Sequence, residues 1–402
     1  MKQKRSFCLT IFSLIFFTYS ALFPGFSNAQ KLEELNTGWH CQQMQKVPFS
    51  GEEISGNTKI ELSDWLPATV PGTVLTSLLN NNKIPDPFYG MNNEEIPDIY
   101  DTGRDHYTYW FYTEFDIEPK KGEEFWLMFR GINYSCEIYL NGDKVNPTTH
   151  AGMFLRQKYH VSNSILKGKN KLAVLVYPPD PVGNPNGGQG GDGVIARNVM
   201  HQYVAGWDWI QPVRDRNTGI WDKVFLEKTG PVDVRNPHVI TLVPGKRIPN
   251  EKQETAHLLI TTELVNTSKK SIKGNLIIKI DDQEAVRELV LDPESIIQSE
   301  KYKITINDPE LWWPNGYGKQ ALYDVDIQFK IDKSLSDHEK VQFGIREIQT
   351  EWNPFTSSRQ VSVNGQKIFI KGGNWIISDA MLRFSEARYD AEIRMHKDMN
   401  LN

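Results

Sequence analysis

Short apolar runs separated by turn residues dominate the first half of the chain. Four of them are HYTYWFYTEFDI (106–117), EFWLMFRGI (124–132), SCEIYLNGDKV (135–145) and NKLAVLVYPP (170–179). Runs of this length, rich in aromatic and β-branched residues, predict β-strands. Asn141-Gly142 favours a two-residue hairpin turn, because both central residues of that turn adopt positive φ. The pattern predicts a β domain over residues 30–230.

The pattern resets near Gly230-Pro231 and resumes with nearly regular spacing. The strands predicted there are AHLLITTELVN (256–266), SIKGNLIIKI (271–280), AVRELVLD (285–292), EKYKITIN (300–307) and ALYDVDIQFKI (321–331). Several short strands at such intervals, in a stretch of about one hundred residues, are typical of an immunoglobulin-like β-sandwich. We therefore predict a second domain over residues 231–345.

Residues 346–402 have a different pattern. Asn364-Gly365 predicts a hairpin, and its second arm, QKIFIKGGNW (366–375), is apolar enough for a buried strand. Ser385 is a suitable N-cap for a helix whose apolar residues recur every four positions: Ala387, Ala391, Met395 and Met399. A buried strand followed by an amphipathic helix is how a (β/α)8 TIM barrel begins. Because a full barrel needs ~250 residues, we expect this chain to be the front part of a longer protein.

Residues 1–29 have the pattern of a secretory signal peptide. Positive charges precede a long apolar run, and Ser27-Asn28-Ala29 ends in the small residue that a cleavage site requires. The sequence therefore predicts a secreted or periplasmic protein, with an uncleaved membrane anchor as the alternative. No later run approaches the ~20 apolar residues of a membrane-spanning helix.

Charge and composition indicate which kinds of ligand the chain can bind. The net charge is −5 and no Lys/Arg run follows the N-terminus, which argues against nucleic-acid binding. The chain has 11 Trp and 15 Tyr, whose flat apolar rings with a polar edge suit sugar binding as well as a core. No Cys or His spacing resembles a metal site, and no cofactor is expected. Cys41 and Cys136 are predicted to be buried free thiols, with a disulfide as the alternative.

The segment AGWDWIQPVRDRNTGIWD (205–222) combines three tryptophans with three aspartates and two arginines. It has neither a helical nor a strand period, and a Gly/Pro-rich loop (180–193) precedes it. Two interpretations remain open: a corner that stabilises the fold, or one wall of a sugar pocket. Arg214-Asp215-Arg216 is predicted as a local set of ion pairs, and Trp221 as a residue packed inside the β domain.

Motifs over most of the chain resemble glycoside hydrolase family two, on its β-mannosidase-like branch. They are VPGTVLTSLL (70–79), IPDPFYGMN (84–92), RGINYSCEIYLNG (130–142), GWDW (206–209), NTGIWDKVFLE (217–227), LWWPNGYGKQALYDVDI (311–327) and VNGQKIFIKGGNWIISD (363–379). The resemblance implies a galactose-binding-like jelly roll at 30–230, then the sandwich, then the first part of a TIM barrel at 346–402.

The resemblance also assigns candidate residues. A retaining glycosidase needs two carboxylates about 5–5.5 Å apart, and in this family both lie on later barrel strands, so no catalytic residue is expected within 1–402. Asp208, between Trp207 and Trp209, would bind sugar hydroxyls. Asn374 and Trp375, and with them Asp379, would line the substrate subsite. The alternatives are a capped turn with packed indoles for the first set and a strand-to-helix turn for the second.

The activity that the resemblance implies is endo-type hydrolysis of the β-mannosidic Manβ1-4GlcNAc linkage of N-glycans. Exo-β-mannosidase or exo-β-D-glucosaminidase activity is the alternative within the family, and a non-catalytic carbohydrate-binding protein is the alternative from another class. The partner expected is an oligosaccharide or a glycoprotein glycan. The plant endo-acting enzymes of this branch lack a secretory signal, so the predicted signal peptide departs from them. Asn133 and Asn266 begin N-glycosylation sequons.

Overall fold

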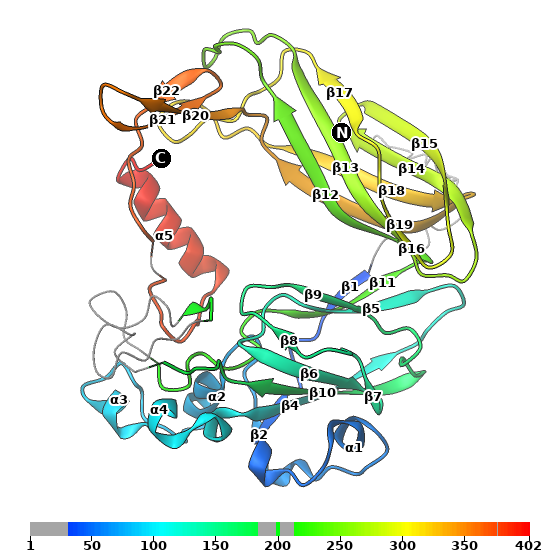
Figure 1. Cartoon of the computed structure of the whole chain (residues 1–402), viewed down its shortest axis with the longest axis vertical. Helices are drawn as coiled ribbons and strands as arrows, with labels where there is room; N and C mark the ends of the chain where they lie inside the picture. Colours follow the sequence, from blue (N-terminus) through cyan, green and yellow to red (C-terminus); the bar gives the residue numbers. More distant parts are fainter. Residues whose placement is uncertain (1–30, 184–197, 202–212, 376) are drawn as a thin grey trace, which may run out of the picture.

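The computed structural model describes residues 31–183, 198–201, 213–375 and 377–402. The predicted signal peptide and Trp207-Asp208-Trp209 lie outside these residues. Two β-rich units and a smaller third part make up the described chain (Figure 1). The mainly β fold class predicted from the strand pattern is confirmed.

The first β unit (residues 31–229) consists of two antiparallel sheets. One sheet has the order β1 (Lys31–Glu34), β11 (Val224–Thr229), β5 (Glu124–Phe129) and β9 (Gln157–His160). The other has the order β3 (Leu66–Pro67), β2 (His40–Gln43), β4 (Tyr109–Ile117), β10 (Gly168–Tyr177), β6 (Ser135–Leu140) and β7 (Asp143–Lys144), with β8 (His150–Ala151) also paired to β6. Short helices connect these strands: α1 (Gly51–Ser55), α2 (Val74–Asn80), α3 (Asn92–Glu95), α4 (Ile99–Thr102) and the 3-10 turns Met44–Lys46, Leu62–Asp64 and Arg104–Tyr107.

Strand β10 explains why one run of this unit is continuously apolar. Leu172, Val174 and Val176 face the core between the two sheets. Ala173 and Leu175 face the opposite side, where Ile54 of α1 and Trp65 cover them. A strand buried on both faces has no reason to alternate polar and apolar residues.

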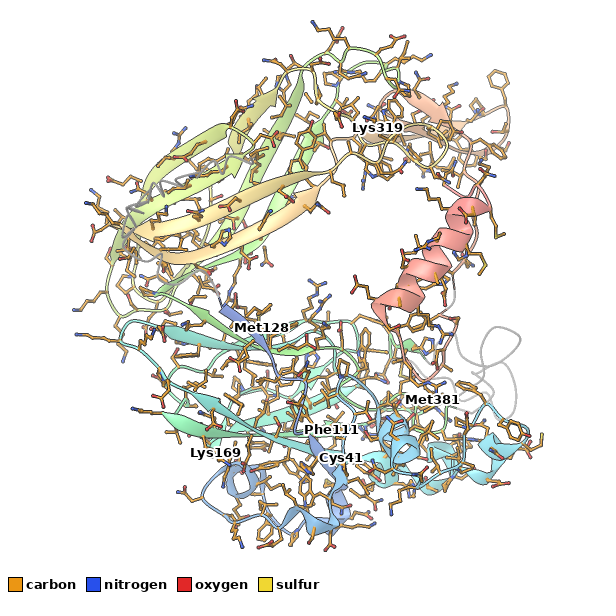
Figure 2. All side chains as sticks on the ribbon, turned by 180° about the vertical axis from the view of Figure 1, so that it is seen from behind. Cys41, Phe111, Met128, Lys169, Lys319 and Met381 are labelled. Atoms are coloured by element: carbon orange, nitrogen blue, oxygen red, sulfur yellow. The ribbon has the colours of Figure 1, made fainter. Side chains whose placement is uncertain are left out.

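The predicted turn and thiols are both confirmed in this unit. Asn141 and Gly142, between β6 and β7, have φ of 53° and 92°, as the hairpin turn requires. Cys41 and Cys136 are free and buried between the sheets (Cys41 is labelled in Figure 2). Burial raises the pKa of the Cys41 thiol to about 12 and raises that of Cys136 as well. Both side chains are therefore neutral thiols at physiological pH.

The second β unit (residues 232–343) is a sandwich of two antiparallel sheets, as predicted. One contains β12 (Val232–Leu242), β13 (Ala256–Asn266) and β16 (Ser295–Gln298), with β17 (Tyr302–Ile306) also paired to β13. The other has the order β15 (Gln283–Leu291), β14 (Ile272–Ile280), β18 (Tyr323–Ile331) and β19 (Ser334–Phe343). Alternate residues of β13 and β18, such as Leu258, Ile260, Val325 and Ile327, are fully buried between the sheets. This period of two is what sequence alternation predicts for strands with one buried face.

The third part contains a three-stranded sheet and one helix. The strands are β20 (Ile348–Asn353), β21 (Ser358–Val363) and β22 (Gln366–Ile368), and the helix is α5 (Glu386–Asp398). The Asn364-Gly365 hairpin is confirmed, and Ser385 caps α5 by accepting a hydrogen bond from the N–H of Arg388 at 3.2 Å. Figure 1 shows α5 running between this small sheet and the first β unit.

The strand predicted over 366–375 ends earlier than expected. Pairing stops at Ile368, and the described residues 369–375 form no strand. Phe369 is 78% exposed and Ile370 is 57% exposed, so this run is not buried here. No residue of α5 is buried either, and Met395 and Met399 lie at the surface. An apolar strand and helix without a covering layer lack the burial that stabilises regular structure.

Both sequon asparagines are buried. Asn133 has no exposed surface, and its amide donates hydrogen bonds to the carbonyls of Arg216 at 2.7 Å and Asn217 at 3.0 Å. Asn266 is 1% exposed and donates to the carbonyls of Lys270 and Asp292. A glycan on either amide nitrogen would disrupt these bonds, so in the folded chain both side chains are structural.

Among the described residues, no helix has the length and apolar character needed to cross a membrane.

Candidate functional site

Residues 378–383, termed here the docking segment, bind the first β unit just before α5. The amide of Asn217 donates to the carbonyl of Ala380 at 2.7 Å, and the hydroxyl of Thr76 donates to that of Met381 at 3.3 Å. Ala380 and Met381 are each 1% exposed and pack with Leu75, Ile96 and Val213 in one apolar cluster. Figure 2 shows Met381 beside the first β unit. Residues far apart in sequence thus form one buried contact.

The Arg214–Arg216 stretch supports this contact, but not by the predicted local ion pairs. The Arg216 guanidinium is fully buried and binds both carboxylate oxygens of Asp98, at 2.9 and 2.8 Å. Arg214 also contacts Asp98, at 3.2 Å. The ion-pair prediction was wrong in its partner, because the carboxylate comes from the residue before α4 and not from Asp215. Bidentate geometry is the strong form of this interaction.

Asp215 has a backbone role instead. Its carboxylate accepts hydrogen bonds from the N–H groups of Leu75 at 2.8 Å and Asn217 at 2.9 Å. Burial raises its pKa to about 6, against the lowering effect of these hydrogen bonds. Asp215 therefore fixes the turn that presents Asn217 to the docking segment.

Trp221 was predicted inside the β domain but lies at its margin. It is only half-buried, its indole N–H donates to the carbonyl of Met153 at 3.0 Å, and its ring meets Phe154 edge-on. The core position is taken by the preceding residue, Ile220, which is fully buried.

The structure gives the predicted subsite residues different environments. Asp379 is 3% exposed and accepts from the N–H of Met381 at 2.9 Å and from Arg383 at 2.8 Å. Asp379 thus caps the docking segment. This role agrees with the alternative interpretation, a strand-to-helix turn, and not with direct substrate contact. Asn374 is exposed, and Trp375 is 52% exposed.

Trp375 is held in place although half of it is exposed. Its indole N–H donates to Glu392 of α5 at 2.9 Å, and its ring meets Phe384 and Tyr389 edge-on. Arg388 lies 3.3 Å from Glu392 and 3.6 Å from Asp379, so a polar chain connects Trp375 to the docking segment. A half-exposed, hydrogen-bonded indole is a suitable surface on which a sugar ring stacks. Among the described residues, a Cβ at Gly372 or Gly373 would meet nothing within 4 Å, so no close packing there requires glycine.

The Trp207-Asp208-Trp209 motif lies outside the described residues, but both ends of its segment are placed. Val213 packs against Ala380 and Met381. His201 is 7% exposed, and its Nδ1 lies 3.1 Å from the side-chain oxygen of Asn217. Burial lowers the pKa of His201, which favours the neutral ring. The motif is therefore attached at both ends to residues that adjoin the docking segment.

Sequence reasoning missed three residues of this site. No pattern indicated the contacts of Asp98 and Asn217, because their partners Arg216 and Ala380 are distant in sequence. Glu392 forms a local pair with Arg388, but nothing indicated its hydrogen bond to Trp375. The one available signal was the pair of arginines at 214 and 216, whose charge needed a carboxylate partner.

We expect Met381→Ala to loosen the docking segment. Truncating a buried methionine removes apolar contacts and leaves a cavity, for a loss of about 2 kcal/mol. Hydrogen exchange followed by mass spectrometry should show faster exchange over 379–398 than in the unaltered chain. Met395→Ala is the matched control, because Met395 is 60% exposed. Equal exchange in the two variants would contradict a docked segment.

Comparisons with known proteins agree with this architecture. Residues 39–222 match the glycosyl hydrolase 2 galactose-binding domain-like model, and residues 247–346 match the glycosyl hydrolases family 2 model. The chain is 41% identical over 389 residues to mannosylglycoprotein endo-beta-mannosidase of Lilium longiflorum, covering 92% of this chain and 40% of that protein.

Two solved structures are similar as well. The exo-chitosanase of Amycolatopsis orientalis superposes with a TM-score of 0.77 at 25% identity, over 92% of this chain and 40% of that one. The β-D-mannosidase of Dictyoglomus thermophilum superposes with a TM-score of 0.72 at 25% identity, over 92% of this chain and 43% of that one.

The fold and these matches define the β-rich domain arrangement of a glycosyl hydrolase, with a galactose-binding-like first domain. The chain belongs to glycoside hydrolase family two. It spans about 40% of the length of the curated lily relative.

Proposed function

We propose that this chain is the N-terminal part of a secreted retaining β-mannosidase-type hydrolase that cleaves the Manβ1-4GlcNAc linkage of N-glycans by endo action. The contact of the docking segment with Asn217 and Thr76 carries the proposal. It joins the part of the chain that follows Trp375 to the described residues on either side of the segment that contains Asp208. The 41% identity to the lily endo-β-mannosidase supports the choice of linkage.

In this proposal the chain supplies substrate contacts and not the two catalytic glutamates. Asp208 accepts hydrogen bonds from sugar hydroxyls, while Trp207 and Trp209 shield those bonds from water. Trp375 offers a ring face, and Asn374 an amide. Asp379 has a positioning role, because its carboxylate is occupied within the docking segment.

The third part supports a barrel that continues in the longer protein. Its exposed apolar side chains include Trp352, Phe355, Phe369, Ile370 and Ile393, each at least 57% exposed. Exposed apolar surface of this extent is typical of a contact face. We propose that further βα units of a TIM barrel cover it and carry the carboxylate pair.

Exo-β-D-glucosaminidase activity is the second candidate, because the Amycolatopsis orientalis exo-chitosanase has a similar fold over 92% of this chain. Three substrates distinguish the candidates when given to the longer protein: a Manβ1-4GlcNAc glycopeptide, an aryl β-mannoside and a chitosan oligomer. We expect the glycopeptide to be hydrolysed with the highest kcat/KM. Preference for the chitosan oligomer would favour the glucosaminidase, and binding without hydrolysis of any substrate would contradict an enzyme.

A further inference from the structure

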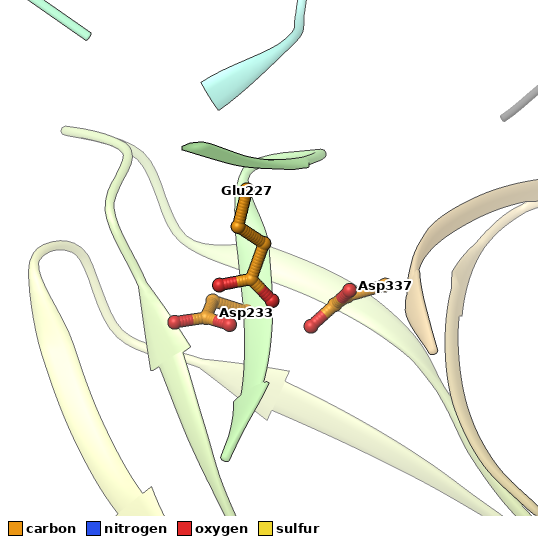
Figure 3. Close-up of side chains that lie close together, drawn as sticks. All are labelled: Glu227, Asp233 and Asp337. Atoms are coloured by element: carbon orange, nitrogen blue, oxygen red, sulfur yellow. The ribbon is translucent and has the colours of Figure 1, made fainter. Parts of the chain in front are cut away.

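A cluster of three buried carboxylates lies where the two β units meet. Glu227 belongs to β11 of the first unit, whereas Asp233 of β12 and Asp337 of β19 belong to the second. Their oxygens lie within 4.8 Å of one another, and each residue is at most 1% exposed. Figure 3 shows the three side chains pointing toward one another. We call these three residues the carboxylate junction.

Two cations face the junction. The Lys158 ammonium lies 2.5 Å from Glu227 and 2.9 Å from Asp233. The Arg235 guanidinium lies 2.5 Å from Asp233. Both also lie over the Trp126 ring of the first unit, at 5.3 and 4.3 Å from its centroid. Three carboxylates against two cations leave one excess negative charge in a buried place, where such a charge is costly.

Asp337 is the carboxylate that the cations leave uncompensated. Among the described residues, its charged contacts include no salt bridge to Lys158 or Arg235. Its Oδ2 accepts from the N–H of Val234 at 2.6 Å, while its Oδ1 is buried with no donor in hydrogen-bond geometry. The imidazole of the next residue on β19, His338, pairs with Asp326 of β18 and not with the junction. A carboxylate oxygen of Asp337 lies within 4.8 Å of oxygens of Asp233 and Glu227, which can only accept hydrogen bonds when ionised.

We propose that the carboxylate junction is a proton-binding site: Asp337 is a neutral carboxylic acid at pH 7, and its hydroxyl donates to the carboxylate of Asp233 or Glu227. One proton removes the excess charge and converts the unsatisfied acceptor into a donor. A divalent ion would overcompensate the single charge and would compete with Lys158, which already lies at hydrogen-bond distance from two of the three carboxylates.

The direction of the pKa shift agrees with this geometry. Burial, and then the negative charge of Asp233, raise the pKa of Asp337 to about 8, while the N–H groups of Val234 and His338 act in the opposite direction. Because the pKa is raised on folding, the stabilising contribution of the protonated form is complete below the ordinary value of 3.8. It is lost as the pH rises toward about 8. The contact between the two β units is therefore pH-sensitive.

Asp337→Asn tests the proposal in the full chain, because the amide keeps the acceptor for Val234, supplies a donor and does not titrate. Unfolding is measured in denaturant between pH 5 and pH 9 at constant ionic strength. The unfolding equilibrium constant of the unaltered chain should rise by up to about tenfold per pH unit in the lower part of this range and level off near pH 8. The variant should lack this step. Asp326→Asn, on the half-buried pair with His338, is the matched control and should keep the step.

If Asp337→Asn does not fold, a second variant tests the same proposal. Glu227→Gln leaves two carboxylates against two cations, so the pKa of Asp337 should fall and the step should move to lower pH, while burial and Asp233 still keep that pKa above its ordinary value. The infrared carbonyl band of a buried carboxylic acid should be present in the unaltered chain at pH 7, absent from Asp337→Asn and weaker in Glu227→Gln. A pH step shared by all variants would overturn the proposal. So would stabilisation by NaCl, KCl, MgCl2 or CaCl2 that requires Asp337, since a metal ion would then take the place of the proton.

Discussion

Asp98→Ala should lower the free energy of unfolding of this chain by about 3–5 kcal/mol, the cost typical of leaving a buried charge without its partner. The Arg216 guanidinium has no exposed surface and binds Asp98 through two parallel hydrogen bonds. Without that carboxylate, the hydrogen bonds left to it among the described residues go to the backbone carbonyls of Val182, Gly183 and Val213, which carry no net charge. Denaturant-induced unfolding followed by circular dichroism measures the loss.

Asp101→Asn is the matched control for this variant. Asp101 lies in α4, the short helix that Asp98 precedes; it is exposed, and its replacement should change stability by no more than about 0.5 kcal/mol. Similar losses in both variants would show that the helix, and not the buried pair, is responsible. Asp98→Asn should fall between the two, because the amide keeps the shape of the side chain without its charge.

Asp208→Ala in the longer enzyme should reduce kcat/KM for a Manβ1-4GlcNAc glycopeptide on the order of 100-fold. The loss corresponds to one or two hydrogen bonds between sugar hydroxyls and a charged acceptor, at about 1.5–3 kcal/mol each. Its stability should change by less than about 0.5 kcal/mol, as for a substitution away from buried networks. Steady-state kinetics and thermal unfolding on the same preparation separate the two effects.

Asp222→Asn is the matched control in the same stretch of sequence. Asp222 forms a partly exposed ion pair with Arg130 at 3.6 Å, so its loss should leave kcat/KM unchanged. If Asp208→Ala instead lowers stability and activity in parallel, the Trp-Asp-Trp motif is a structural corner. Comparison of Asp208→Asn with Asp208→Ala then distinguishes charge from hydrogen bonding at this position.

Local chemistry made much of the fold predictable. Alternating apolar and polar residues along β13 and β18 indicate strands with one buried face. The continuous apolar run of β10 indicates a strand buried on both faces. The Asn-Gly pairs at 141 and 364 specify their hairpins because the turn itself selects those residues. In each case the cause acts within a few residues, so the sequence carries the signal directly.

The contacts between distant segments were not predictable in the same way. Nothing near Asp98 in the sequence indicates that two arginines more than a hundred residues later require it. The apolar run after Gln366 predicted a buried strand, yet burial depends on what covers it, and pairing ends at Ile368. The substrate role proposed for Trp375 rests on family resemblance. The structure adds the Glu392 hydrogen bond that orients its ring.

The Asn217 side chain limits how this protein can be recombined with its relatives. One end contacts His201, the other binds the carbonyl of Ala380, and the backbone is fixed by Asp215. A chimera that takes its first domain from one parent and its later segments from another would separate these partners. Transplantation of the turn at 213–219 and residues 378–383, together with Leu75, Thr76 and Ile96, keeps the interface of one parent intact. In such chimeras, the residues that form the contact between the first domain and the docking segment must therefore come from the same parent.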